Sequence, residues 1–117
     1  MRGLLQDIVD RVPGAYGAAV IGLDGITVER VSSREDFNID LVSAEGINVV
    51  KRAIAEARDR PEDRPEEITI SSRSGLTILR ALGADYFLCV VVGPDGTPGR
   101  ARYEAWRAGV QLEETVR

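Results

Sequence analysis

The chain has 117 residues, of which 44% are apolar and 29% are charged, and its formal net charge is −4. This length and composition predict one folded domain over residues 1–117, which removes roughly two thirds of the unfolded surface from water. Nucleic acid is disfavoured as a partner because phosphate binding requires clustered Lys and Arg, whereas acidic residues are interleaved here. The sequence has no His and only one Cys, Cys89, which excludes a disulfide framework, a zinc site and a Cys-His nucleophile pair within one chain. We therefore expect no metal and no cofactor.

The sequence predicts a cytoplasmic protein that does not insert into a membrane. The longest apolar run, residues 86–92, is far too short to span a bilayer. The opening stretch M-R-G-L-L-Q-D-I-V-D carries acids among its apolar residues, which argues against a signal peptide.

The first half of the chain predicts a helix, a β-hairpin and a longer helix. Pro13-Gly14 ends the first helix, and Gly25 supplies the positive φ that the hairpin turn L-D-G requires. A polar loop then leads to Asn38, whose side chain suits the cap of the long helix. The predicted elements are a helix at 4–12, strands at 15–22 and 26–31, and a helix at 38–58.

The second half predicts three strands and a last helix. The linker D-R-P-E-D-R-P-E-E precedes strands that are joined by the short turns R-S-G and G-A-D, which indicates an antiparallel meander. The loop G-P-D-G-T-P-G leads into the helix. The predicted ranges are 67–72, 76–82 and 85–92 for the strands and 100–115 for the helix.

The character of each strand predicts its place in one sheet. Residues 86–92 and 15–21 are apolar on both faces apart from Tyr16, as expected for central strands with helices above and below. The strands at 67–72 and 26–31 alternate with polar residues and belong at the edges. The predicted fold is α/β of the α+β type, with a five-stranded antiparallel sheet in the order 2-1-5-4-3 and helices on both faces.

Close packing explains why the central strand at 15–22 has so few large side chains. Gly17, Ala18 and Ala19 leave room for a helix to approach closely. On the long helix, Gly46 lies within an apolar arc of roughly 160°. A glycine there costs about 0.5–1 kcal/mol relative to Ala, so it indicates close backbone contact unless it is merely tolerated. The other residues of the arc are Ile39, Val42, Ile47, Val49, Val50, Ala53, Ile54 and Ala57.

Four stretches in fixed order carry a resemblance to a known family. They are I-V-D-R-V-P-G-A-Y-G-A-A-V-I-G-L-D-G-I-T-V-E, V-V-K-R-A-I-A-E-A, I-T-I-S-S-R-S-G-L-T-I-L-R-A-L-G-A-D-Y-F-L-C-V-V-V and G-R-A-R-Y-E-A-W-R-A-G. Their order and spacing resemble the Roadblock/dynein light chain domains, particularly the small bacterial members grouped with the gliding-motility regulator MglB. The resemblance covers nearly the whole chain, although no single stretch is a sharp motif. It implies a roadblock/longin/profilin-like fold.

The resemblance also implies a homodimer in which the third strands pair edge to edge and the long helices pack together. Two features of the sequence are compatible with this dimer. The strand at 67–72 contains no Pro or Lys that would block pairing. A row of residues at i, i+4, i+7 and i+11 on the long helix includes small side chains that would admit a partner helix, although a solvated face that happens to include alanines is an equal alternative. The row is Ala44, Asn48, Lys51 and Ala55, and the expected interface consists of Ile68, Ile70, Ala44, Asn48 and Ala55.

The partner that the resemblance implies is a Ras-like small GTPase, bound on the long helices at a surface that includes Asn48, Lys51 and Arg52. The chain lacks a phosphate-binding loop of the type G-x-x-x-x-G-K-[ST], so we expect it to be no enzyme itself. It would act as a GTPase-activating protein only through the active site of its partner. The candidates for an arginine supplied to that site are Arg73, Arg100, Arg102 and Arg107, although charged helix faces are usually just solvated.

Two other functions stay open. A dimeric scaffold or adaptor would form the same dimer and leave GTP hydrolysis unchanged. A small-molecule sensor domain would need a cavity within the core, where few polar groups are expected to point inward.

Overall fold

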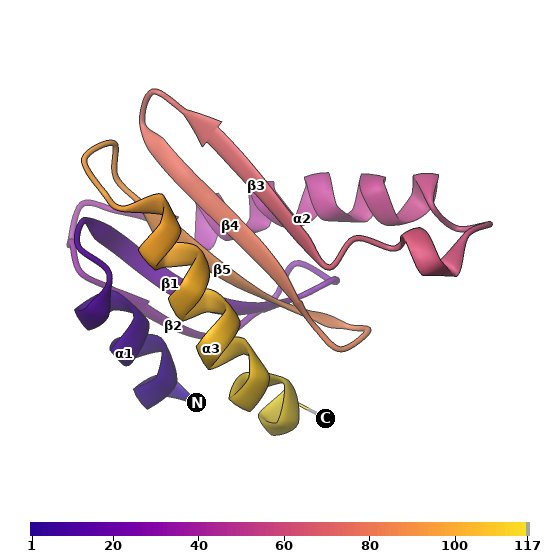
Figure 1. Cartoon of the computed structure of the whole chain (residues 1–117), viewed down its shortest axis with the longest axis horizontal. Coiled ribbons are helices and arrows are strands. Elements are labelled where there is room, and N and C mark those ends of the chain that lie inside the picture. Colours follow the sequence, from indigo (N-terminus) through magenta and orange to yellow (C-terminus); the bar gives the residue numbers. More distant parts are fainter. Residues whose placement is uncertain (117) are drawn as a thin grey trace.

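The computed structural model describes residues 1–116 as a five-stranded antiparallel sheet with helices on both faces (Figure 1). The strands lie in the order β2-β1-β5-β4-β3. The predicted order of elements and strand order are confirmed, and the ends of the elements differ from the predicted ends by at most two residues. The elements are α1 (Arg2–Arg11), β1 (Ala15–Gly22), β2 (Thr27–Ser32), α2 (Ile39–Glu56), the 3₁₀ turn η1 (Pro61–Asp63), β3 (Glu67–Ser72), β4 (Gly75–Leu82), β5 (Tyr86–Val92) and α3 (Pro98–Val116).

Local chemistry explains where the elements begin and end. The Asn38 side chain accepts a hydrogen bond from the Leu41 backbone N–H at 3.0 Å and caps α2, as predicted. Gly25 has a φ of +85° in the turn between β1 and β2, in the region that favours glycine. The sequence prediction treated the whole linker after α2 as irregular, but Pro61 at the start of η1 presets the φ of a short helical turn there.

The helices divide the core into two layers, one on each face of the sheet. Figure 1 shows α1 and α3 side by side in front of the strands and α2 behind them. The central strands β1 and β5 are buried at almost every position, whereas no residue of the edge strand β3 is fully buried. The sheet is therefore closed to solvent in its middle and accessible at its β3 edge.

No helix in residues 1–116 combines the length and the apolar character that a membrane crossing requires.

The small residues of β1 and α2 lie where the packing leaves least space. A Cβ atom added to Gly17 would lie 2.9 Å from the Val31 carbonyl oxygen and 3.4 Å from the Ile39 side chain at the start of α2. A Cβ added to Gly46 would lie 2.8 Å from a methyl group of Leu79 on β4. Ala19 is completely buried in the core layer beneath α2. At these positions α2 approaches both β1 and β4 closely.

Two residues of α2 depart from the predicted apolar arc. Val49 was expected to be buried, but 45% of its surface is exposed. At about 100° per residue Val49 lies at the rim of the arc, where the sheet no longer covers the helix. Ser43 is completely buried instead, because it lies near the centre of the same arc, beside the Cys89 thiol.

We expect Gly46→Leu to lower the free energy of unfolding by about 1–3 kcal/mol or more, because the new side chain must displace Leu79 in a packed core. Gly17→Leu and Ala19→Leu should do the same, and denaturant unfolding followed by circular dichroism measures all three. The matched control is Gly3→Ala in α1, where no atom lies within 4 Å of the added Cβ. That variant should gain about 0.5–1 kcal/mol from helix propensity. Unchanged stability in all three core variants would refute close packing.

Cys89 should be inert toward thiol reagents in the folded protein. Burial raises the pKa of its thiol to about 11, against a smaller opposing effect of the neighbouring Ser43 hydroxyl. The reactive species is the thiolate, so almost none is present at pH 8. Absorbance assays with a disulfide reagent should show modification only after denaturant is added. Stoichiometric labelling within seconds under native conditions would contradict this burial.

Candidate interaction surface

The backbone of β3 presents one edge of the sheet with its hydrogen-bonding groups free. The Ala81 N–H donates to the Glu66 carbonyl at 2.8 Å, which fixes the alternation of the β3–β4 ladder. By that alternation Glu67, Thr69 and Ser71 turn their N–H and C=O groups away from β4. No hydrogen bond of the structure within residues 1–116 uses these groups. Three consecutive outward positions are therefore available for pairing with another strand.

The predicted interface residues of β3 lie on the face of the sheet that α2 covers. Ile68 and Ile70 are half-buried and pack against the core layer beneath α2. Glu67 points to the other face, where its carboxylate accepts from Arg102 of α3 at 2.7 Å and lies 3.4 Å from Arg80 of β4. These ion pairs fix the first residue of β3 in place.

Two contacts determine how α2 is rotated on the sheet. Asp40 accepts from Arg30 of β2 at 2.7 Å, and Gly46 faces Leu79 of β4. At about 100° per residue, Val42 and Val49 lie roughly opposite Asp40. This flank of α2 therefore faces away from β2 and toward the part of the sheet that ends in β3.

The predicted row of small residues lies on the other flank. Ala44, Asn48, Lys51 and Ala55 are centred roughly 150° around the helix from the Val42–Val49 flank. The structure thus does not bring this row together with Ile68 and Ile70. Ala44 is half-buried, whereas the other three are exposed. In Figure 1, the C-terminal turns of α2 extend past the strands.

The positive charges expected to meet a GTPase are accessible. Lys51 and Arg52 are both exposed, and no ion pair within residues 1–116 involves either of them. Asn48 lies one turn before them and is exposed as well. These three residues form a polar, positively charged surface on α2.

Three of the four candidate arginines are held by carboxylates of this chain. Arg102 binds Glu67, and Arg100 and Arg107 lie 3.7 and 2.8 Å from Glu104, which is only 1% exposed. Sequence reasoning missed Glu104, although its spacing of four residues from Arg100 and three from Arg107 was a usable signal. The fourth, Arg73, is exposed in the β3–β4 turn, and no ion pair in the described part of the chain includes it.

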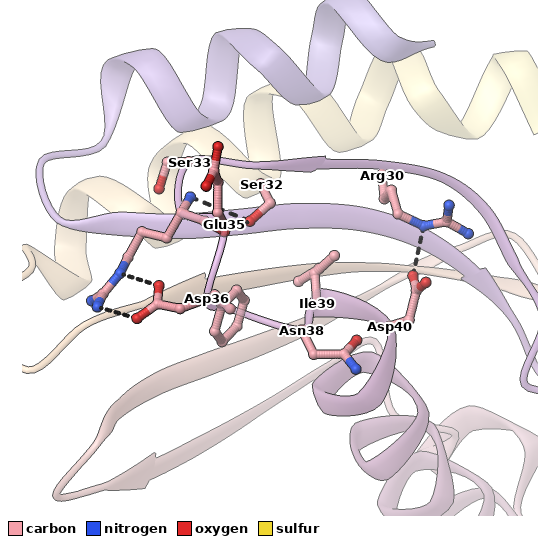
Figure 2. Close-up of a pocket in the computed structure, with 10 residues that line it drawn as sticks. Arg30, Ser32, Ser33, Glu35, Asp36, Asn38, Ile39 and Asp40 are labelled. Atoms are coloured by element: carbon pink, nitrogen blue, oxygen red, sulfur yellow. Dashed lines mark hydrogen bonds and ion pairs between the residues drawn. The ribbon is translucent and has the colours of Figure 1, made fainter.

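A surface pocket of about 570 Å³ lies at the loop between β2 and α2 (Figure 2). Figure 2 shows Asp36 and Asp40 each joined to an arginine at its rim. The arginine paired with Asp36 is Arg34, which also stacks over the Tyr16 ring at 4.5 Å. A hydrogen bond from Arg34 lowers the pKa of the Asp36 carboxyl. Four of the five charged residues that line the pocket are thus paired with one another, Glu35 being the exception. The pocket lies on the surface rather than in the core that a sensor domain would need.

The fold places the protein among structures of the Roadblock/LC7 type. The structure of a Roadblock/LC7 domain from Streptomyces avermitilis matches with a TM-score of 0.84 at 16% identity, over 99% of this chain and 97% of that one. The predicted resemblance to Roadblock-type domains is confirmed by this likeness, and the strand order and helix layers are those of that fold.

Two bacterial proteins of the Mgl group are similar in structure. MglC from Myxococcus xanthus matches with a TM-score of 0.71 at 26% identity, over 97% of both chains. MglB from the same organism matches with a TM-score of 0.84 at 10% identity, over 98% of this chain and 93% of that one. No protein-family model matches the sequence, and neither does any curated protein.

Proposed function

We propose that this chain is a non-enzymatic, homodimeric regulator that binds a Ras-like small GTPase. The observation that carries the dimer is the open β3 edge, whose outward backbone groups at Glu67, Thr69 and Ser71 lie beside the half-buried Ile68 and Ile70. The GTPase as partner follows from the resemblance to Roadblock-type domains and from the likeness to MglB and MglC. In this proposal the whole chain acts as one Roadblock-type domain.

The geometry of β3 favours one register for the pairing of two copies. Antiparallel pairing about a two-fold axis uses the most outward groups when Thr69 lies opposite Thr69 of the second copy. Glu67 then pairs with Ser71, and Ile68 lies across from Ile70. The isoleucines of both copies form one apolar strip on the α2 face of the joined sheet, next to the exposed Val49.

The two flanks of α2 suit two different contacts. The Val42–Val49 flank faces the proposed dimer seam and would bury apolar surface there. Asn48 and Lys51 lie away from that seam, and Arg52 lies between them and the Val42–Val49 flank. All three are exposed and stay available for the GTPase. Ala44 and Ala55, which the sequence assigned to the dimer, are better placed beside this second surface.

The proposed mechanism is that the dimer orders the mobile switch loops of the GTPase, whose own groups then hydrolyse GTP. Three of the four candidate arginines are paired with Glu67 or Glu104, so an arginine finger from this chain would first have to break an ion pair. The fourth candidate, Arg73, lies in the β3–β4 turn and not on α2.

The dimer register is tested by single cysteines in β3. Thr69→Cys should form an intermolecular disulfide under mild oxidation, because the two copies of residue 69 lie directly opposite each other. Ser71→Cys is the matched control: it is equally exposed on the same strand, but it lies opposite residue 67. Non-reducing gel electrophoresis measures the linked fraction. Equal linking of both variants would contradict this register, and a single species of 12.7 kDa in sedimentation equilibrium would contradict the dimer itself.

GTPase binding is tested with a Ras-like GTPase encoded beside the gene for this protein. We expect binding that prefers the GTP form and accelerates phosphate release in a single-turnover assay. Lys51→Glu and Asn48→Arg should weaken both effects, because they change the charge and shape of the exposed α2 surface. Gly3→Ala in α1, on the opposite face of the sheet, serves as a control on another surface.

The arginine variants distinguish the mechanisms. Replacement of Arg73, Arg100, Arg102 or Arg107 by Ala should leave most of the acceleration intact. An arginine whose loss abolished acceleration while binding survived would overturn the mechanism. Binding without acceleration would favour a scaffold, and absence of binding to either nucleotide form would exclude this partner.

A further inference from the structure

The second edge of the sheet, β2, differs from β3 in how its outward backbone groups are used. The Ser33 N–H donates to the Tyr16 carbonyl at 2.9 Å, which fixes the alternation of the β1–β2 ladder. By that alternation Val31 and Glu29 bond to β1, and Arg30 turns its N–H and C=O groups outward. Arg30 is therefore the central position at which another strand would pair with this edge.

Both outward groups of Arg30 are already occupied by side chains of the same chain. The Arg30 N–H donates to Glu29 Oε1 at 3.0 Å, and the Arg30 carbonyl accepts from Arg2 Nη1 at 3.2 Å. The same Arg2 nitrogen donates to Glu29 Oε1 at 3.1 Å, which joins the two bonds into one clasp. The backbone hydrogen bond from Arg30 lowers the pKa of the Glu29 carboxyl below its usual range, so Glu29 is ionised at neutral pH.

We infer that this Arg2–Glu29 clasp closes the β2 edge to pairing with a second copy of the chain. An incoming strand would have to displace two hydrogen bonds at Arg30 before it gained its own. A β-bulge at Val28 of β2, opposite the step from Val20 to Ile21 of β1, distorts the ladder further along the same edge. Nothing comparable covers Glu67, Thr69 and Ser71 of β3 within the described residues.

The consequence is a limit on the size of the assembly. A chain with two open edges can extend its sheet from copy to copy without end, whereas a chain with one open edge closes as a two-fold dimer. The limit to a dimer rests on the proposed β3 dimer. The closure of β2 does not rest on that dimer, because opening β2 adds one association step whether the wild-type chain is a dimer or a monomer.

The test is the double variant Arg2→Ala/Glu29→Ala, examined with the full chain by sedimentation velocity over a range of concentrations. We expect a weight-average mass that exceeds the wild-type value at equal concentration and increases as the concentration increases. The matched control is Arg60→Ala/Asp63→Ala, which removes another exposed arginine–carboxylate ion pair. Arg60 directly precedes η1 and Asp63 is its last residue, away from both edge strands. This control should sediment as the wild type.

A third variant identifies the edge that is responsible. Arg30→Pro in the Arg2→Ala/Glu29→Ala variant removes the outward N–H and the Arg30–Asp40 ion pair but no ladder bond, and proline is tolerated on edge strands. It should restore the wild-type mass. Arg30→Ala in the same variant removes only the ion pair and should leave the larger species unchanged. A double variant that sediments as the wild type at every concentration, or larger species that survive Arg30→Pro, would overturn the inference. A monomeric wild type would instead remove the β3 dimer, and the double variant would then still be expected to associate.

Discussion

The structure depends on a sheet that is covered on both faces in its middle. The central strands β1 and β5 must be apolar on both sides, and β1 must also be thin where α2 approaches it at Gly17 and Ala19. Both strands are paired with a neighbour on each side along most of their length. Strand pairing with another molecule is therefore confined to the two edge strands, β2 and β3.

The two edge strands differ in whether their outward backbone groups are hydrogen-bonded. On β2, the outward groups of Arg30 are hydrogen-bonded by Arg2 and Glu29. On β3, side-chain interactions hold the strand through Glu67 but leave the outward backbone groups free. An edge that is fixed in position and still unpaired is preorganised for strand addition, because little conformational entropy is lost when a second strand binds. The proposed dimer uses that edge.

The fold could be predicted because the sequence features that indicate it lie within single elements and turns. Apolar periodicity, the turn glycines and the contrast between two-sided and alternating strands determine the elements and their order in the sheet. The rotation of α2 could not be predicted, because Val49 at the rim of the apolar arc and Ser43 near its centre are distinguished only by which strands lie beneath them. Pairings such as Arg2 with Glu29 link residues that are far apart in the sequence and carry no local signal.

The rotation of α2 has a consequence for how one small domain could hold two partners at once. If the Val42–Val49 flank and the surface formed by Asn48, Lys51 and Arg52 lay on the same side of α2, a second copy and a GTPase would compete for one surface. Asp40 and Gly46 instead anchor the helix so that Val49 faces the β3 side and Lys51 lies away from it. Glu67 pairs with Arg102, and Glu104 pairs with Arg100 and Arg107, so these arginines of α3 are not free. The surface proposed for a GTPase is then the weakly basic one on α2. In the proposed function, such a surface would act on hydrolysis by selecting one conformation of its partner.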